Sequence, residues 1–564
     1  MEATESRRGP RLVPPIVQSN PWIVLLVLTL GYFMILVDTT IVNVALPTME
    51  SDLHAGFDQI LWIVNAYILV YAVLLITAAR LGDIFGPKRL FLAGLVLFTL
   101  ASAACGVTQD ANQLILFRAI QGIGAALLTP QTLAVLPTIF APERRGAAFG
   151  ILSSVAGLAV VVGPTVGGWL VTNYNWQAIF FLNVPIGIVA VLAAILLVPD
   201  VRSDRAPALD LPGVALASGG LLALIYALVE SQRFSWGPIL SLGSFSVGSS
   251  RWSVISVYSL LVYAAVLLAL FLWWERRAAA PLLPFALFED RNYAVANLIF
   301  SIIGFPFAMF IVLSLFLQSI LGFSAIHAGL SLIPASVGIM IAGPVAGRLS
   351  DRFNGKYVLL AGLSVATIGV ILTAFALTLS VTSWQLIPPL AVTGLGMGFV
   401  FAPATTLAMR DVQPALAGAA SGVLFTNRQV GQALGSAVIG SVLANRVATE
   451  LPLQVSRFAA QVPTAFRHQF VAGFERAARH AQDFGAGQSH GIASAAGTSH
   501  ATARHLAALS HDVFGQAFLS AARPSLAICA GVLILAALFA TGLRGGRTAT
   551  TTSAEFPVPG EGAA

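Results

Sequence analysis

Long apolar stretches separated by short polar segments follow one another along most of the chain. Each stretch is about 20 residues or longer, which is the length that an α-helix needs to cross the hydrocarbon core of a bilayer. Fourteen of them occur, at residues 22–46, 58–79, 90–109, 112–136, 146–172, 177–198, 211–230, 253–274, 293–319, 328–347, 357–380, 384–408, 415–445 and 524–543. The pattern predicts an all-α integral membrane protein with 14 transmembrane helices.

The positive charges between these stretches are distributed unevenly. If the N-terminus is cytoplasmic, the cytoplasmic segments include basic residues such as Arg80, Arg144 and Arg348, whereas the opposite short loops carry only Arg233 and Arg251. Short loops rich in Arg and Lys stay on the cytoplasmic side. We therefore expect a multi-pass protein of the inner (plasma) membrane with both termini in the cytoplasm.

Three motifs recur about 270 residues apart and divide the chain into two halves. The pairs are 79–89 with 347–356, 122–124 with 396–398, and 146–150 with 418–422. We expect a cytoplasmic tail (1–21), an N-terminal six-helix half (22–198), two inserted spans (211–274), a C-terminal six-helix half (293–543) with an extracytoplasmic loop (446–523), and a cytoplasmic tail (544–564). In transporters built from two parallel halves, the substrate site lies between them near mid-membrane.

Composition narrows the class of protein. Hydrophobic residues make up 57% of the 564 residues and charged residues only 10%, with a mean hydropathy of +0.86. Such a low charge content excludes a soluble domain. The net charge of +6 comes mainly from basic residues at span ends, so we expect contact with membrane lipid and no nucleic acid. The two cysteines, Cys105 and Cys529, suggest no disulfide framework, and we expect no metal.

The long extracytoplasmic loop is rich in Ala, Gly, Ser and Gln. It contains six of the eight histidines, which are His468, His480, His490, His500, His505 and His511. A metal site or a pH sensor is conceivable, but the spacing is irregular and the loop has no cysteine. We expect a solvated, partly helical loop, with an amphipathic helix over 466–479.

Asp38 is the only Asp or Glu that lies clearly inside a predicted span. A carboxyl group is costly to bury in a membrane, so its presence indicates a functional site. Arg118 lies at a similar depth in the fourth span, and we expect it to pair with Asp38 in at least one state. Because a buried carboxyl group can bind and release a proton, the pair is our candidate for proton coupling. The alternative is a structural role, in which Asp38 caps a local kink.

The fifth span is unusually rich in small residues, with Gly157, Gly163, Pro164, Gly167 and Gly168. Glycine and proline weaken a helix, and a span tolerates them where another helix must approach closely. Ordinary small-residue packing explains isolated glycines. The full pattern favours a helix whose smooth face slides against, or seals, a neighbouring helix.

This glycine pattern resembles the antiporter motif on the fifth span of proton-coupled exporters in the major facilitator superfamily. Residues 36–47 are similar to the first-span signature of the fourteen-span drug/proton antiporter family. Residues 118–124 resemble the superfamily's fourth-span motif, whose Arg is implicated in proton transfer, and residues 175–187 resemble the entry to span six. The resemblance covers about residues 22–445 and the last span.

The resemblance implies the major facilitator fold and a proton-coupled antiporter that exports small amphiphilic compounds, such as drugs, by alternating access. The proton gradient is then the energy source, so no cofactor is expected, and we expect a functional monomer. The motifs do not name the substrate. An exporter of an endogenous lipid, siderophore or antibiotic, with drugs as incidental substrates, is the alternative. A membrane-embedded enzyme would need converging acids, histidines or a metal site, whereas Asp38 stands alone.

Two cytoplasmic loops resemble the superfamily's gating motif. The residues concerned are Asp83, Gly86, Lys88 and Arg89 in the first copy, and Asp351 and Arg352 in the second. A carboxylate at this position can accept hydrogen bonds from a helix N-terminus or basic side chains of the partner half and so latch the inner gate. The first copy departs from the family pattern at Ala79 and Pro87, which predicts a weaker latch.

Five residues are candidates for the wall of the substrate cavity: Trp62, Asn65, Tyr67, Gln121 and Arg428. Aromatic residues serve packing as often as binding. Arg428 lies about midway along the thirteenth span, and no carboxylate occurs at that depth in the second half. Backbone carbonyls, Asn427 or an anionic substrate group can satisfy it, so both a structural role and a substrate role stay open.

Overall fold

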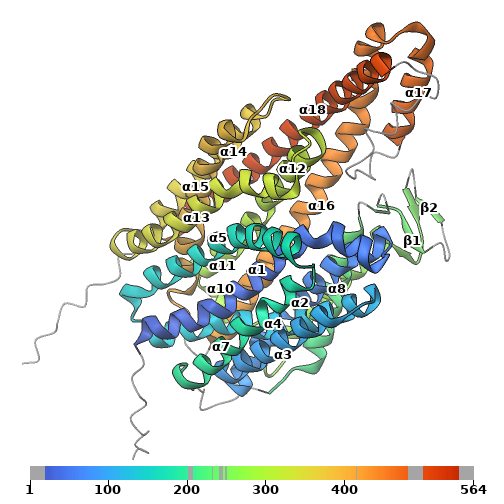
Figure 1. The fold of residues 1–564 in the computed structure, drawn as a ribbon. Helices are drawn as coiled ribbons and strands as arrows, with labels where there is room; N and C mark the ends of the chain where they lie inside the picture. Colours follow the sequence, from blue (N-terminus) through green and yellow to red (C-terminus); the bar gives the residue numbers. More distant parts are fainter. Residues whose placement is uncertain are drawn as a thin grey trace, which may run out of the picture.

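The structure of the protein is a computed structural model, which describes residues 20–200, 208–231, 233–234, 236–240, 245–247, 250–413, 416–479 and 500–544. Long helices pack side by side into an elongated bundle, and a smaller group of elements projects from one end of it (Figure 1). The N-terminal half contains α1 (Pro21–Leu53), α2 (Phe57–Phe85), α3 (Pro87–Val107), α4 (Ala111–Ile139), α5 (Pro142–Asn173), α6 (Ala178–Phe181) and α7 (Asn183–Leu197).

The C-terminal half repeats this arrangement, and its last two long helices, α16 and α18, are 42 residues each. It contains α10 (Ala286–Glu289), α11 (Arg291–Gly304), α12 (Ala308–Leu315), α13 (Ala325–Arg352), α14 (Gly355–Ala376), α15 (Ser383–Met409), α16 (Ala417–Phe458), α17 (Thr464–Arg479) and α18 (His500–Thr541). The predicted span 293–319 is interrupted by a 3-10 turn at Phe305–Phe307 and a π-helical segment at Phe316–Ile320. Pro306 lies in the 3-10 turn, where its missing N–H prevents a regular helix.

Within the described residues, 13 helices or helical segments are long and apolar enough to cross a membrane. The chain is therefore a multi-pass membrane protein. The helix that replaces the predicted span 415–445, α16, is not among the 13, because glycines, glutamines and Arg428 make it less apolar. It is nevertheless 42 residues long and packs in the bundle against α11, α18, α2 and α4. The number fourteen thus stays a prediction.

Corresponding helices of the two halves pack in corresponding ways. α4 lies against α2 and α3, and α15 lies against α13 and α14. The paired glycines serve this packing: a Cβ on Gly124 would meet the backbone nitrogen of Phe98 at 2.6 Å, and one on Gly398 would meet the backbone oxygen of Ile339 at 2.9 Å. These contacts fit the internal repeat that the motifs predict.

The two inserted helices, α8 (Leu211–Glu230) and α9 (Val257–Glu275), pack on each other, and α8 also packs on α2. Between them lie four short strands, β1 (Pro238–Leu240), β2 (Phe245–Val247), β3 (Ser250–Trp252) and β4 (Ile255–Ser256). They form two antiparallel pairs, β1 with β4 and β2 with β3. The all-α prediction missed them, because they are only two or three residues long and lie almost entirely between the predicted spans 211–230 and 253–274.

The described parts of the predicted outer loop are more helical than expected. α16 continues to Phe458 and α18 already begins at His500, so both extend well beyond their predicted spans. Together with α17 they enclose a small apolar core of their own, which includes Leu451, Val455, Phe470, Phe474, Leu506 and Leu509. We call residues 446–479 and 500–523 the outer helices; they project from the upper right end in Figure 1.

The amphipathic helix predicted over 466–479 is confirmed as α17. Two of the histidines contact backbone carbonyls: His505 Nε2 lies 3.3 Å from Gln461 O, and His511 Nε2 lies 2.7 Å from Ile320 O. His480 and His490 lie outside the described residues.

Candidate functional site

Asp38 and Arg118 form a buried ion pair inside the N-terminal half. Arg118 Nη1 donates to Asp38 Oδ2 at 2.5 Å, and the two side chains are 1% and 0% exposed. Gln121 Nε2 and Asn183 Nδ2 both donate to Asp38 Oδ1, at 2.9 and 3.1 Å. The guanidinium also donates through Nη1 to Gln121 Oε1 at 2.7 Å and through Nε to Ile63 O at 3.1 Å. The predicted pairing is present, with more partners than predicted.

Burying two charges is expensive, and their attraction offsets the loss of water only if further hydrogen bonds satisfy both groups. Asp38 accepts bonds from three donors contributed by α4 and α7. Donors from two helices therefore surround both oxygen atoms of the Asp38 side chain.

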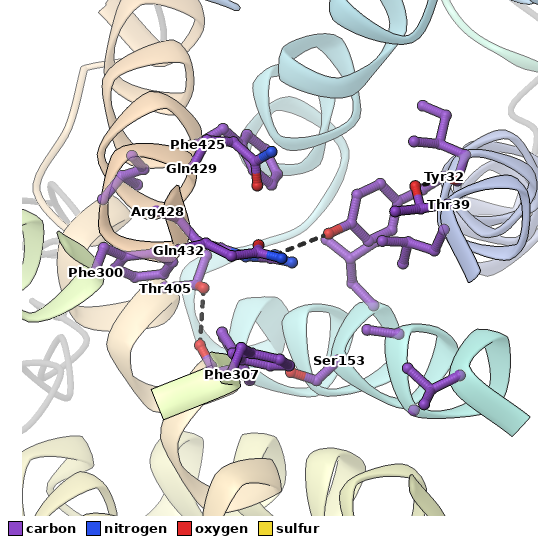
Figure 2. A pocket seen from close by; sticks show the side chains of 18 of the residues that line it. Tyr32, Thr39, Ser153, Phe300, Phe307, Thr405, Phe425, Arg428, Gln429 and Gln432 are labelled. Atoms are coloured by element: carbon purple, nitrogen blue, oxygen red, sulfur yellow. Dashed lines mark hydrogen bonds between the residues drawn. The ribbon is translucent and has the colours of Figure 1, made fainter. Parts of the chain in front are cut away.

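A cavity of about 190 Å³ lies between the two halves. It is lined from α1, α2, α4 and α5 on one side and from α11, the Phe305–Phe307 turn, α13, α15 and α16 on the other. Most of its wall is apolar or aromatic. Figure 2 shows Phe300, Phe307 and Phe425 around Arg428, with Tyr32, Thr39 and Ser153 facing them from the N-terminal half.

Two of the five predicted cavity residues, Tyr67 and Arg428, line this space. The prediction that the other three line it is wrong. Gln121 points to Asp38 instead. Trp62 packs against Tyr226 of α8, with ring centroids 5.7 Å apart, and Asn65, one turn further along α2, is not part of the cavity wall either. Helical periodicity does not tell which face of α2 the inserted spans cover.

Tyr67 connects the ion pair with the cavity. Its ring lies over the Arg118 guanidinium, 4.3 Å from ring centroid to Cζ, while the same side chain lines the cavity. Thr39, the residue after Asp38, also lines the cavity, whereas Asp38 itself does not. A bound compound would therefore contact the neighbours of the ion pair, and the carboxylate would stay out of reach.

Arg428 projects from α16 across the cavity. Its Nη1 donates to the hydroxyl of Tyr32 on α1 at 3.2 Å, which links the two halves (Figure 2). Its guanidinium also lies 5.4 Å from the ring centroid of Phe401. Asn427, which was one predicted partner, donates instead to Asn297 Oδ1 at 2.9 Å.

The glycine-rich helix α5 lies between α1 of its own half and α13 of the other half. On the α1 side, a Cβ on Gly163 would lie 3.2 Å from the backbone nitrogen of Ile41, and one on Gly167 would also meet the Ile41 side chain. On the α13 side, a Cβ on Gly157 would lie 2.7 Å from Ser336 O. The predicted smooth face thus exists on both sides of α5.

The other two positions of the motif also contact α13. A Cβ on Gly168 would lie 2.7 Å from the Ile326 side chain, and a Cβ on Gly329 would lie 3.0 Å from Pro164. α5 and α13 share the most extensive contact between any two helices of the structure. This interface joins the two halves.

Both gating aspartates contact a helix of the opposite half near its N-terminal end. Asp351 of α13 accepts from the backbone N–H groups of Gly146 and Ala147, both at 2.9 Å. Asp83 of α2 lies against Gly418 at the start of α16. The two contacts are reciprocal, since each half supplies one aspartate and one helix.

The remaining gate residues have more local roles. Gly86 ends α2 with a φ of 94°, a conformation that glycine adopts without strain. Lys88 Nζ donates to Ile195 O at 2.8 Å. Arg89 and Arg352 are exposed at the surface. The interpretation of basic side chains as part of the latch is therefore unsupported for these three residues.

Sequence reasoning missed several residues of the site. Asn183 was part of a recognised motif without an assigned role, and Tyr32, Phe307 and Phe401 were not singled out. Gln432 follows Arg428 by four residues, so both lie on one face of α16. That spacing could have predicted that Gln432 lines the cavity with Arg428. Pro306 could likewise have predicted the turn that places Phe307 in the cavity wall.

Comparisons with known proteins agree with this architecture. The major facilitator superfamily profile matches residues 28–436. The tetracenomycin C resistance and export protein of Streptomyces glaucescens is 32% identical over 551 residues, which cover 96% of this chain and 95% of that protein. The multidrug resistance protein Stp of Mycobacterium tuberculosis (strain CDC 1551 / Oshkosh) is 34% identical over 430 residues, covering 76% and 77%.

A solved structure shares the fold at low sequence identity. The proton:xylose symporter bound to 6-bromo-6-deoxy-D-glucose matches with a TM-score of 0.52 and 12% identity, covering 82% of this chain and 94% of that one. The family profile, the relatives and the two-half architecture lead to one conclusion: the chain belongs to the major facilitator superfamily of transporters.

Proposed function

We propose that this protein is a proton-coupled exporter that moves small amphiphilic compounds, including drugs, out of the cell by alternating access. In this proposal it works as a monomer in the inner (plasma) membrane, with fourteen spans, both termini cytoplasmic, lipid around it and no cofactor. Relatives of similar length are named as resistance and export proteins, which supports the direction of transport. The cavity between the halves is mostly apolar and aromatic, which suits amphiphilic compounds.

The buried Asp38–Arg118 pair is the observation that carries the proposal. It is fully buried, it consists of ionisable groups, and it lies one side chain away from the cavity through Tyr67. When Asp38 takes up a proton, Arg118 loses its counter-charge and moves, and the Tyr67 ring packed on it moves too. A compound bound against Tyr67 opposes that movement. Proton and compound therefore exclude each other through a shared neighbour.

The movement reaches the other half through α1 and α5. Thr40 follows two residues after Asp38 and donates to Ala159 O of α5 at 3.2 Å. The next residue, Ile41, fills the space over Gly163 and Gly167. The opposite side of α5 packs on α13. A shift of α1 on protonation would thus be transmitted to the interface on which the halves rock.

The membrane potential provides enough free energy to keep a drug at a low concentration inside the cell. One charge that crosses 100 mV provides about 2.3 kcal/mol. Since about 1.36 kcal/mol corresponds to a tenfold ratio, one net charge per cycle sustains a gradient of roughly fifty-fold.

The experiment uses purified protein in proteoliposomes with an imposed pH gradient. Wild-type protein should accumulate a fluorescent drug against its gradient, and collapse of the pH gradient should stop this. Asp38→Asn keeps the shape of the side chain but cannot bind a proton, so it should leave only downhill movement. Asp58→Asn, at the exposed start of α2, is the matched control and should behave as wild type. Uphill transport by Asp38→Asn would contradict the proposal.

A second candidate is export of an endogenous lipid, siderophore or antibiotic, with drugs as incidental substrates. Arg428 favours it, because many such products are acidic and this arginine has no carboxylate partner among the described residues. The relative that covers 96% of this chain is named as the tetracenomycin C resistance and export protein. Competition between lipid or antibiotic and drug in the same vesicles distinguishes the two.

A further inference from the structure

The cavity holds a single charge. Among the described residues that line it, Arg428 is the only one with a charged side chain; the others are aromatic, aliphatic or neutral polar. Asp38 lies outside the cavity, and its charge is matched by Arg118. The interior surface that a substrate meets is therefore positive.

Arg428 has no carboxylate partner in the part of the chain that the structure describes. Its one side-chain hydrogen bond is to the neutral Tyr32 hydroxyl, and its Nε is buried without a hydrogen-bond partner. A buried guanidinium in this condition retains most of its capacity to bind an anion.

Further donors lie beside it. Gln429 and Gln432 are on the same helix and line the same cavity (Figure 2). Neither of their side-chain amides makes a hydrogen bond to another described residue. Together with Arg428 they place several N–H groups on one wall. An acidic group with two or three oxygen atoms could bind to all three side chains.

The wall next to these donors is aromatic. Phe307, Phe401 and Phe425 surround the guanidinium on the C-terminal side, and Tyr67 and Tyr71 stack on each other on the N-terminal side, with centroids 6.0 Å apart. Aromatic rings pack well against one another in offset or edge-on arrangements. The shape and surface suit a flat ring system attached to the acidic group.

We propose that the preferred substrate is a small aromatic anion, whose carboxylate, sulfonate or phenolate binds Arg428 and whose ring system packs between the two aromatic walls. The inference rests on the proposed function in one respect: it takes this cavity as the site of export. The new element is that the exported compound is negatively charged. An anion that leaves while a proton enters moves two charges in the favourable direction per cycle, so its export should depend more steeply on membrane potential than export of a neutral compound.

The test uses two probes with the same skeleton. 1-Anilinonaphthalene-8-sulfonate (ANS) carries a sulfonate, and N-phenyl-1-naphthylamine (NPN) is the same molecule without it. Binding of each is measured by fluorescence on protein in nanodiscs, with empty nanodiscs subtracted, and export is measured in proteoliposomes. Ethidium serves as an aromatic cation. The variants are Arg428→Gln and Arg428→Lys, with Arg233→Gln outside the cavity as the control.

Wild-type protein should bind ANS at least about tenfold more tightly than NPN, as expected for a charge-assisted hydrogen bond. Arg428→Gln should lose this preference while NPN affinity changes by less than about twofold. Arg428→Lys, which keeps the charge, should retain most of it, and Arg233→Gln should match wild type. Unchanged NPN affinity also shows that Arg428→Gln is folded.

Three results would overturn the inference. They are equal affinity for ANS and NPN, ANS affinity that does not depend on Arg428, or tighter binding of ethidium than of ANS. If pH-driven export of drugs persists in any of these cases, the proposed function stands and only the charge preference is wrong. If ANS binds through Arg428 but no pH gradient drives export, the inference stands and the coupling mechanism fails.

Discussion

Arg118 in the N-terminal half and Arg428 in the C-terminal half both lie deep in the bundle, yet their surroundings are opposite. Arg118 is 1% exposed and bonded to a carboxylate, a glutamine and a backbone carbonyl. Arg428 faces a cavity, and among the described residues its hydrogen-bond partner is a tyrosine hydroxyl. The Arg118 guanidinium has several hydrogen-bond partners within the protein, whereas the Nε of Arg428 has none among the described residues.

The comparison shows that the two halves share the arrangement of their helices but differ in their buried charged side chains. The paired glycines Gly122 and Gly396 are 274 positions apart (396 − 122), and the same offset places Val392 opposite Arg118. The second half thus has no counterpart of the ion pair. We infer a division of labour, in which the N-terminal half senses the proton and the C-terminal half supplies the charge that meets the cargo.

The largest expected effect follows from breaking the ion pair. Arg118→Ala leaves the Asp38 carboxylate buried without its counter-charge, which costs about 3–5 kcal/mol of stability. The neutral double variant Asp38→Asn/Arg118→Gln should recover much of that loss without recovering transport. Thermal unfolding in detergent, combined with transport assays, checks both points. Additive losses in the double variant would show that the two residues are not coupled.

Next in size is the effect of filling the α1–α5 contact. Gly163→Leu would force a side chain into Thr40 and Ile41, and overpacking of this kind costs about 1–3 kcal/mol. We expect inserted protein whose pH-driven export is slow or leaky. The matched control is Gly531→Ala, since a Cβ there meets nothing within 4 Å. Normal export by Gly163→Leu would show that this face has no part in coupling.

Replacing Arg428 should affect stability less than replacing Arg118 does. Arg428→Met removes a partly unsatisfied donor group, so it should change the stability by less than about 1 kcal/mol, or raise it. This contrasts with the loss expected for Arg118→Ala, and the same unfolding measurement compares them. If Arg428→Met destabilises as strongly as Arg118→Ala, Arg428 is structural and the division of labour between the halves is wrong.

The smallest effect on transport is expected from the outer helices. Replacing residues 459–499 with a short linker removes α17 but leaves both six-helix halves intact. Exposure of the apolar residues on α16 and α18 should lower thermal stability, so the linker variant also carries Leu451→Gln and Leu506→Gln. Proton-coupled export should stay within about twofold of wild type. Complete loss of transport with normal insertion would give these helices a role in gating.

The sequence was most informative where charge is rare. A single intramembrane carboxyl and an arginine at matching depth predicted the ion pair, because membrane burial leaves such groups few alternatives. It was least informative about orientation. Trp62 and Gln121 were placed on the cavity wall, yet Trp62 packs on the inserted α8 and Gln121 turns to Asp38. Which face of a nearly uniformly apolar helix points inward depends on the neighbouring helices. The hydropathy of the helix itself carries no information about those neighbours.

The outer helices show a related limit. Their Ala-rich composition resembles a loop when compared with the strongly apolar spans, but α16 and α18 simply continue beyond them and bury Phe470 and Phe474 of α17. Amphipathic helices outside a membrane need far fewer apolar residues than spans do. A hydropathy threshold chosen to find membrane spans therefore misses amphipathic helices outside the membrane.

Proton release on substrate binding tests the account most directly. Adding a transported compound to weakly buffered, detergent-solubilised protein should release protons from the wild type, measured at several pH values between about 6 and 9. In our proposal a bound compound favours the arrangement in which Arg118 is paired with Asp38 and packed under Tyr67. Asp38→Asn should bind the compound without releasing protons, and Asp38→Glu should release them with a shifted pH profile. Proton release of wild-type size from Asp38→Asn would contradict the account, because the coupling group would then lie elsewhere.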